Sequence, residues 1–424
     1  MLKQRDSYIR KKFGKEEEWK QVNEGQYVVT EINEEDLYNK MFPSKKELQE
    51  YYNYRKKWFE QGSKAEPGEK PLSINCELVS TCNLACTMCY TITSKFQNSV
   101  IGAQRMLPWK IVKSVIDECA KEKIPSISFS WRGESTLYRD HDENGKLITF
   151  PDVLKYARDK EIHEITCLTH GQLIDDDMAQ KIVDAEPTWI NFSIDGFKEN
   201  YNKIRTPAKK QNTNYNAFQD VVNAIKRIVK YKKLKKKTRP VIRTNTIYPA
   251  VLNDFPEYKE FFFNLGVEYI TVNEIYDVRH FKAPEKLIRK NWYCHYPFQR
   301  LTISSNGIIL PCTGAVNEEK NLVVGKIKGS TDKVVRDTDG KIVETKIESF
   351  NLMEAWNSHK IKWIRELHKS NRRTEIEPGC KNCHIGQIQK GYSKIPKSWD
   401  TEKSKWKMHK AISSKERYRR RSIS

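Results

Sequence analysis

The chain has 424 residues and a formal net charge of +21, and this length allows two or three domains with sizeable cores. It contains no run of the roughly 18 apolar residues that a membrane helix needs, and residues 1–20 lack the apolar segment of a signal peptide. The composition therefore argues against membrane-spanning and secreted proteins, and we predict a cytoplasmic location. In a reducing compartment, ten cysteines in clustered spacings indicate metal ligands rather than disulfides.

The positive charge is concentrated in two stretches. Residues 226–243 contain ten Lys or Arg and no acid, and residues 403–424 contain nine against Glu416 alone, so together they supply 18 of the 21 net charges. We interpret them as a solvated helix end with its loop and as a basic tail. An anionic partner such as RNA is the less favoured alternative.

Residues 1–70 form a charged arm with one predicted helix. Ser44 and Glu47 have the spacing of a capping box, and apolar residues follow at helical intervals. A linker over residues 62–71 is expected to separate this arm, which packs on the next domain, from the rest of the chain.

From residue 71 to about 273, short β-like runs alternate with amphipathic helical stretches. The predicted strands are 74–79, 126–130, 164–168, 189–194, 241–247 and 269–273. The predicted helices between them are 108–121, 151–160, 175–185, 217–231 and 254–265. Six successive β/α units predict an α/β fold with parallel strands.

Three thiols, Cys82, Cys86 and Cys89, lie on one short loop after the first predicted strand. Three thiolates can hold three irons of a 4Fe-4S cube and leave the fourth iron open to a small-molecule ligand. A zinc site is the alternative, but it would need a fourth ligand nearby. This C-x3-C-x2-C spacing resembles the radical S-adenosylmethionine (SAM) superfamily, and the resemblance implies a partial (β/α)6 TIM-type barrel in which SAM chelates the open iron.

The resemblance also implies SAM contacts at the carboxyl ends of the strands, where such barrels place their chemistry. Gly133-Glu134 resembles the Gly-Gly-Glu motif that holds the SAM ammonium group, with Arg132 replacing the first glycine. His170 replaces the asparagine of a Thr-Asn-Gly motif. The remaining cysteines Cys76, Cys119 and Cys167 are predicted to be buried as small apolar residues. The predicted cofactor-binding residues are Tyr90, Gly133, Glu134, Thr169, Ser193, Asp195 and Asn273.

A second set of cysteines follows the barrel. Asn306-Gly307 lies between two apolar runs, which predicts a β-hairpin that brings Cys294 near Cys312. Cys380 and Cys383 add a C-x2-C pair, and the four thiols fit either structural zinc or an iron–sulfur cluster. The spacing resembles the SPASM and shorter twitch extensions of radical SAM enzymes, which implies one auxiliary 4Fe-4S cluster with four protein ligands.

Four segments are therefore expected. They are an arm (residues 1–70), a radical SAM core (71–285), a SPASM-like domain of a β-hairpin and helices (286–386) and a basic tail (387–424). Within the SPASM-like domain we predict a helix starting near Leu352 and an inserted hairpin over residues 329–347 with a turn at Asp339-Gly340.

The resemblance implies an enzyme that cleaves SAM reductively and takes hydrogen from a substrate. We predict an oxidoreductase or mutase acting on a hydroxylated or aminated sugar-like small molecule, with an electron donor such as flavodoxin or ferredoxin. The alternatives are a peptide-maturing enzyme, an RNA-modifying enzyme and a metal-bearing interaction protein. The sequence identifies no catalytic acid or base.

Overall fold

The computed structural model describes residues 20–23, 26–32, 34–93, 96, 106–208, 216–247, 250–251, 253–273, 288–330, 335–336, 342–343 and 347–386. The predicted basic tail (387–424) and the Asp339-Gly340 turn lie outside these residues. Within the described part of the chain, no helix is both long and apolar enough to cross a membrane.

Six parallel strands form the centre of the molecule. They are β3 (Ser73–Cys76), β4 (Ser126–Phe129), β7 (Glu164–Thr169), β8 (Trp189–Ser193), β9 (Val241–Ile247) and β10 (Tyr269–Asn273). Each strand pairs with the next in this order, so strands that follow one another in the chain are neighbours in the sheet. The predicted α/β fold with six parallel strands is confirmed.

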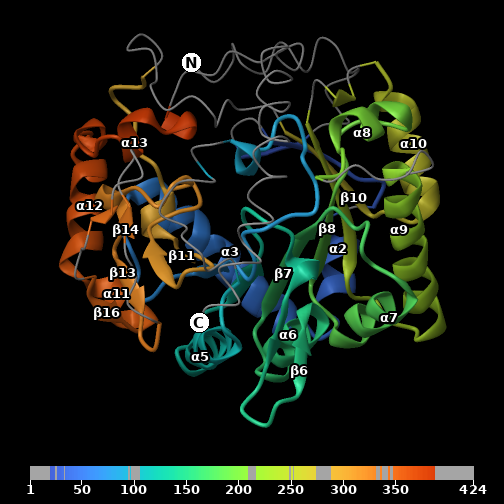
Figure 1. Cartoon of the computed structure of the whole chain (residues 1–424), viewed down its shortest axis with the longest axis horizontal. Helices are drawn as coiled ribbons and strands as arrows, with labels where there is room; N and C mark the ends of the chain where they lie inside the picture. Colours follow the sequence, from blue (N-terminus) through green and yellow to red (C-terminus); the bar gives the residue numbers. More distant parts are fainter. Residues whose placement is uncertain are drawn as a thin grey trace.

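Helices cover one face of these strands (Figure 1). They are α5 (Trp109–Lys121), α6 (Phe150–Asp159), α7 (Asp176–Ala185), α8 (Glu199–Ile204), α9 (Ala217–Leu234) and α10 (Phe255–Leu265). The strand residues that face these helices, such as Ile190 and Phe192, are fully buried in the main core. The alternate residues Asn191 and Ser193 are half-buried, because they face the inside of the partial barrel. Cys76, Cys119 and Cys167 are buried in the main core, as predicted.

The N-terminal arm closes one end of the barrel. It contains β1 (Lys20–Asn23), β2 (Gln26–Val29), α2 (Glu34–Met41) and α3 (Lys45–Lys64). The predicted capping box is present, since Glu47 N donates to Ser44 Oγ and Ser44 N donates to Glu47. Leu37 and Met41 pack against Trp189 and Val241, the first residues of β8 and β9. The arm therefore covers the amino ends of the strands and leaves their carboxyl ends to the functional site.

Two features of the arm differ from expectation. Strand β2, which the sequence analysis missed, extends the sheet by pairing antiparallel with β10. The predicted linker does not begin at Gly62, because helix α3 continues to Lys64 and ends where Ala65 adopts a left-handed backbone. Gly62 packs closely there, since a Cβ atom would lie 2.7 Å from the side-chain Nε2 of Gln299.

The C-terminal part continues the same sheet from its other edge. It contains β11 (Arg300–Ile303), β12 (Ile308–Leu310), β13 (Gly325–Ile327), β14 (Val335–Arg336), β15 (Ile342–Val343), β16 (Ser349–Phe350), α11 (Leu352–Asn357), α12 (His359–Lys369) and α13 (Gly379–Asn382). Strand β11 pairs parallel with β3 and antiparallel with β12, which confirms the hairpin at Asn306-Gly307. Short antiparallel pairing of β14 with β15 agrees with the predicted inserted hairpin. The orange and red elements lie together at one side of the molecule in Figure 1.

The remaining elements are short. A hairpin of β5 (Arg139–His141) and β6 (Leu147–Thr149) precedes α6. Single turns of 3-10 helix occur at Tyr90–Ile92, Ser135–Leu137, Tyr296–Phe298, Lys320–Leu322, Arg373–Glu375 and His384–Gly386.

Candidate functional site

The loop that carries Cys82, Cys86 and Cys89 is fixed by backbone hydrogen bonds to the segment after α8. Ala85 N donates to the Thr206 carbonyl (2.7 Å), and Ala208 N donates to the Asn83 carbonyl (2.7 Å). Burial raises the pKa of the Cys82 thiol, and the neighbouring Cys86, Glu134 and Cys89 raise it further. The three thiols therefore interact electrostatically in a buried site where thiolates are stable only beside positive charge, which is the chemistry of a metal cluster.

Gly133 lies directly against the chain that enters this loop. Its Cα approaches so closely that a Cβ atom would lie 2.2 Å from the Val79 carbonyl oxygen and 2.6 Å from that of Thr81. Glu134 N donates to the same Thr81 carbonyl at 2.9 Å. Only glycine allows this contact between two backbones, so Gly133 sets the position of Glu134 relative to the cysteine loop.

The Glu134 carboxylate is buried and ionised. Its Oε1 accepts from Thr136 N (3.1 Å), Thr136 Oγ1 (2.6 Å) and Thr169 Oγ1 (2.6 Å), and its Oε2 accepts from His170 N (2.9 Å). Burial raises the pKa of Glu134, but His170 and these hydrogen bonds outweigh it, so the net shift is downward. Each carboxylate oxygen has about two acceptor directions, so Oε1 is filled by its three donors and Oε2, with one donor, has one direction for a further donor such as an ammonium group.

His170 connects Glu134 with the cysteine loop. Its Nδ1 accepts from Gln172 N (3.0 Å), so in the neutral ring the proton is on Nε2. This Nε2–H donates to Oδ1 of Asn83 (2.8 Å), the residue after Cys82, and lies 3.4 Å from Oε2 of Glu134. The histidine that replaces the expected asparagine therefore ties the end of β7 to the cysteine loop.

The other residues predicted to contact SAM have unequal environments. The Thr169 hydroxyl donates to Glu134 and accepts from Gly171 N, and the Asp195 carboxylate accepts from the Arg205 guanidinium (2.5 Å) and from Ile247 N (3.1 Å). Ser193 and Asn273 are half-buried at the ends of β8 and β10. Thr169 and Asp195 thus fix their neighbours, whereas Ser193 and Asn273 lie on the inner face.

Tyr90 points toward the C-terminal domain. It is buried, packs edge-on against Phe96 with ring centroids 5.3 Å apart, and shares an apolar cluster with Val316. Burial and nearby Glu319 raise its pKa. This places Tyr90 beside the chain that follows Cys312.

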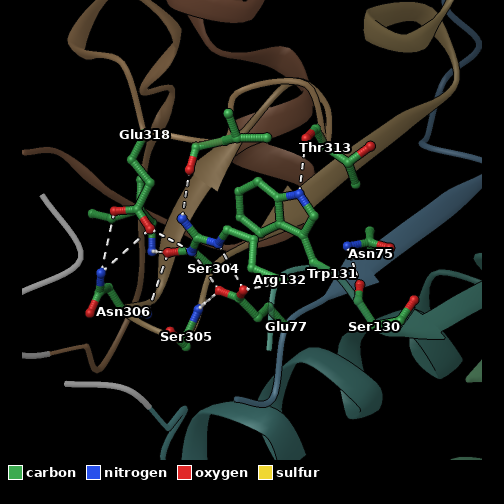
Figure 2. Close-up of polar contacts among 12 residues, drawn as sticks. Asn75, Glu77, Ser130, Trp131, Arg132, Ser304, Ser305, Asn306, Thr313 and Glu318 are labelled. Atoms are coloured by element: carbon green, nitrogen blue, oxygen red, sulfur yellow. Dashed lines mark hydrogen bonds and ion pairs between the residues drawn. The ribbon is translucent and has the colours of Figure 1, made fainter. Parts of the chain in front are cut away.

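A buried group of three charges, which the sequence analysis missed, joins the barrel to the C-terminal domain (Figure 2). Arg132 donates through Nε and Nη2 to the Glu77 carboxylate (2.8 and 2.5 Å) and through Nη2 to Glu318 (2.8 Å). Its side chain lies 3.8 Å from the centre of the Trp131 ring, and the Trp131 indole donates to the Thr313 carbonyl. Burial lowers the pKa of Arg132, but Glu77 and Glu318 outweigh burial and raise it. We call Glu77, Arg132 and Glu318 the charge triad.

The triad gives a structural role to Arg132, which stands where the Gly-Gly-Glu motif has its first glycine. Glu77 follows β3, Arg132 precedes Gly133-Glu134, and Glu318 follows the Cys312 loop. Ser305 N also donates to Glu77 (2.8 Å). One signal in the sequence could have indicated the charge triad, namely the acidic Glu77 inside the apolar run predicted as a strand.

The second set of cysteines also converges. Cys294, Cys312 and Cys380 are buried, and Cys383 is half-buried. A Cβ atom on Gly314 would lie 3.4 Å from the sulfurs of both Cys312 and Cys383, so these two sulfurs lie on the same side of this glycine. Burial raises the pKa of Cys380, and Cys312, Cys383 and Cys294 raise it further. These four donors fit an iron–sulfur cluster whose irons are all held by the protein.

Within the described residues, no three His, Cys, Asp or Glu side chains are grouped so as to hold a single metal ion. This arrangement does not count against a cube, because in a 4Fe-4S cluster each thiolate binds a different iron.

Family comparisons identify both regions. Residues 77–248 match the radical SAM superfamily, and residues 294–384 match the SPASM iron-sulfur cluster-binding domain. The chain is therefore a radical SAM protein with a C-terminal SPASM domain. This class binds SAM and 4Fe-4S clusters, as the sequence predicted.

Curated relatives are similar over different lengths. Residues of this chain are 31% identical to Fe-coproporphyrin III synthase of Methanosarcina barkeri over 137 positions, which span 32% of this chain and 30% of that protein. The tungsten-containing aldehyde ferredoxin oxidoreductase cofactor-modifying protein of Pyrococcus furiosus is 20% identical over 342 positions, 73% of this chain and 86% of that one. The serine-type anaerobic sulfatase-maturating enzyme of Bacteroides thetaiotaomicron is 28% identical over 207 positions, 48% and 45% of the two chains.

Among solved structures, native anSMEcpe with bound AdoMet aligns with a TM-score of 0.48 at 14% identity. The alignment covers 81% of this chain and 99% of that one.

Proposed function

We propose that this protein is a radical SAM enzyme that oxidises or rearranges a hydroxylated or aminated sugar-like small molecule. When bound, SAM and a reduced 4Fe-4S cluster supply one-electron cleavage of SAM to methionine and a 5'-deoxyadenosyl radical, which takes a hydrogen atom from a C–H bond. The first cluster is assigned to Cys82, Cys86 and Cys89. The auxiliary cluster is assigned to Cys294, Cys312, Cys380 and Cys383.

In this proposal the remaining acceptor direction of Glu134 Oε2 binds the SAM ammonium group. The observation that supports it is the saturation of Oε1 by Thr136 and Thr169, which holds the carboxylate in one orientation. A carboxylate that is already oriented and ionised binds a cation without the entropic cost of ordering itself.

Net oxidation is supported by the four thiols of the auxiliary site. A substrate radical that becomes a two-electron oxidation product must lose one electron and one proton. A cluster with no open iron suits electron transfer rather than substrate binding, and an external carrier of the ferredoxin or flavodoxin class would then accept the electron.

A polar substrate is supported by the inner face of the barrel. Half-buried side chains with hydrogen-bonding groups occur along β4, β8 and β9, namely Ser128, Asn191, Ser193, Arg243 and Asn245. Arg243 belongs to the amino end of the barrel, because its Nε donates to Thr271 Oγ1 (2.6 Å) and its guanidinium lies over the Trp189 and Tyr269 rings. The other four side chains fit hydroxyl or amino groups better than an apolar substrate.

The basic stretch 226–243 gives little support to an RNA substrate. Lys232 pairs with Glu268 (3.0 Å), Lys235 with Asp184 (2.6 Å) and Lys237 with Glu186 (3.0 Å). These ion pairs neutralise part of the charge within the protein itself, so less remains to attract phosphates.

Hydrogen transfer to 5'-deoxyadenosine tests the proposal. The anaerobically reconstituted protein is incubated with SAM, a reductant and perdeuterated aminosugars or cyclitols, and deuterium in 5'-deoxyadenosine is measured by mass spectrometry. Deuterium transfer with formation of a carbonyl product supports the proposal. SAM cleavage without deuterium transfer from any sugar, but with deuterium transfer from a deuterated peptide, would refute the sugar substrate in favour of a peptide substrate.

Peptide modification is the second candidate, and the similarity to a sulfatase-maturating enzyme favours it. This alternative predicts that a peptide from the protein that the enzyme modifies, rather than a free sugar, stimulates SAM cleavage.

A further inference from the structure

His368 connects two of the four auxiliary cysteines. It lies in α12, is 1% exposed, and contacts residues from opposite ends of the SPASM domain. Cys294 N donates to its Nδ1 at 3.0 Å, and its Nε2 lies 3.3 Å from the sulfur of Cys380. No motif of the sequence analysis included this residue.

The first contact determines the proton position of the second. Because the Cys294 amide can only donate, Nδ1 must be the unprotonated acceptor, and the neutral ring carries its proton on Nε2. The Nε2–H group therefore donates to the Cys380 sulfur.

Helix α12 holds the imidazole rigidly. Ser358 caps the helix by accepting from Ile361 N, and Ile361, Ile364 and Leu367 are buried in the main core. One helical turn before His368, the buried Arg365 donates to the Pro297 and Trp356 carbonyls. A side chain on such a platform has little freedom to move away from the sulfur.

We propose that His368 is a positioning residue that donates an N–H···S hydrogen bond to the Cys380 ligand of the auxiliary cluster and raises its reduction potential. Hydrogen bonds to cluster sulfurs are among the factors that set the potential. Reduction adds negative charge to the cluster and its sulfurs, so an N–H dipole stabilises the reduced form more than the oxidised form. The inference rests on the proposed assignment of the four thiols, and it would make the auxiliary cluster a better electron acceptor.

The test uses the full-length protein with a single cluster. The parent variant carries Cys82→Ala, Cys86→Ala and Cys89→Ala, which remove the ligands of the first cluster. The auxiliary cluster is then the source of the electron paramagnetic resonance signal. In this background His368→Leu removes the donor, and His368→Gln keeps an amide N–H near the position of Nε2. The exposed His359, at the start of the same helix, provides the control His359→Leu.

Redox titration followed by electron paramagnetic resonance measures the potential of each reconstituted variant. We expect His368→Leu to lower the equilibrium constant for one-electron reduction about tenfold, which corresponds to a 59 mV lower potential. His368→Gln should recover most of this change, and His359→Leu should match the parent.

Unchanged potential in His368→Leu, with about four irons bound, would overturn the inference. If His368→Leu binds no cluster, the potential of His368→Gln tests the inference instead. A Gln variant that also fails to bind iron, or that has a lowered potential, contradicts a role for the N–H donor. Because this background cannot cleave SAM, the outcome is independent of the substrate. A lowered potential together with no sugar oxidation by the wild-type protein would reject only the proposed function.

Discussion

Replacing Arg132 with methionine should destabilise the protein strongly, because it leaves Glu77 and Glu318 buried without their cation. These carboxylates are 1% and 0% exposed, and the Arg132 side chain donates three hydrogen bonds to them. Removing one partner of a buried ion pair costs about 3–5 kcal/mol. We expect a loss in this range at pH 7.

The magnitude also follows from the cost of protonation. A carboxyl with an ordinary pKa of about 4.3 must take up a proton at pH 7 if it cannot stay charged, which costs about 1.36 kcal/mol for each of about 2.7 pH units, or about 3.7 kcal/mol. In the variant the folded-state pKa is raised above the unfolded value, so the folded protein binds more protons and gains stability relative to the unfolded chain as the pH falls. At pH 5 the same cost is about 1 kcal/mol.

Urea unfolding of the reduced, metal-free protein, followed by far-ultraviolet circular dichroism at both pH values, measures the difference from wild type. Adding Glu318→Gln to Arg132→Met should restore part of the stability, because one buried charge is removed. Lys328→Met, which breaks the exposed ion pair with Glu354, is the matched control and should have no measurable effect. A wild-type midpoint for Arg132→Met at pH 7, or a loss that does not shrink at pH 5, would refute the reasoning.

Four further outcomes are expected. The wild-type protein should hold about eight irons after anaerobic reconstitution, and the triple alanine variant of the first cysteine loop about four, with no SAM cleavage; stoichiometric zinc without iron would contradict both cluster assignments. Glu134→Gln should weaken SAM binding by about 1–3 kcal/mol with unchanged iron content, measured by equilibrium binding, and unaltered affinity would remove Glu134 from the site. Gly133→Ala should abolish SAM binding while the auxiliary cluster stays intact, because its Cβ would overlap the Val79 carbonyl. Deleting residues 403–424 should leave SAM cleavage unchanged, and a salt-sensitive, submicromolar RNA complex lost on this deletion would favour the RNA alternative.

The sequence alone predicted the features that depend on short-range patterns. The strands and helices of the barrel follow from alternating and helical spacing of apolar residues, and their bounds agree with the structure to within about three residues. The Asn306-Gly307 turn and the capping box at Ser44 are likewise local, because each needs only a few neighbouring residues to form. The cysteine spacings are also local features, and they led to the resemblance to radical SAM proteins.

Tertiary structure decided the features that join distant parts of the chain. Strand β2 pairs with β10 about 240 residues later, the charge triad links residues 77, 132 and 318, and His368 bridges residues 294 and 380. The sequence does not identify these partners, since a buried polar side chain, even the acidic Glu77 in its apolar run, reveals its partner only when folding brings the two together. For the same reason the sequence placed Thr169 and Tyr90 near SAM, whereas the structure shows which neighbours their side chains meet. Local periodicity thus determined the barrel and the two cysteine sites, and long-range hydrogen bonding in a low-dielectric interior determined how those two sites are positioned and connected.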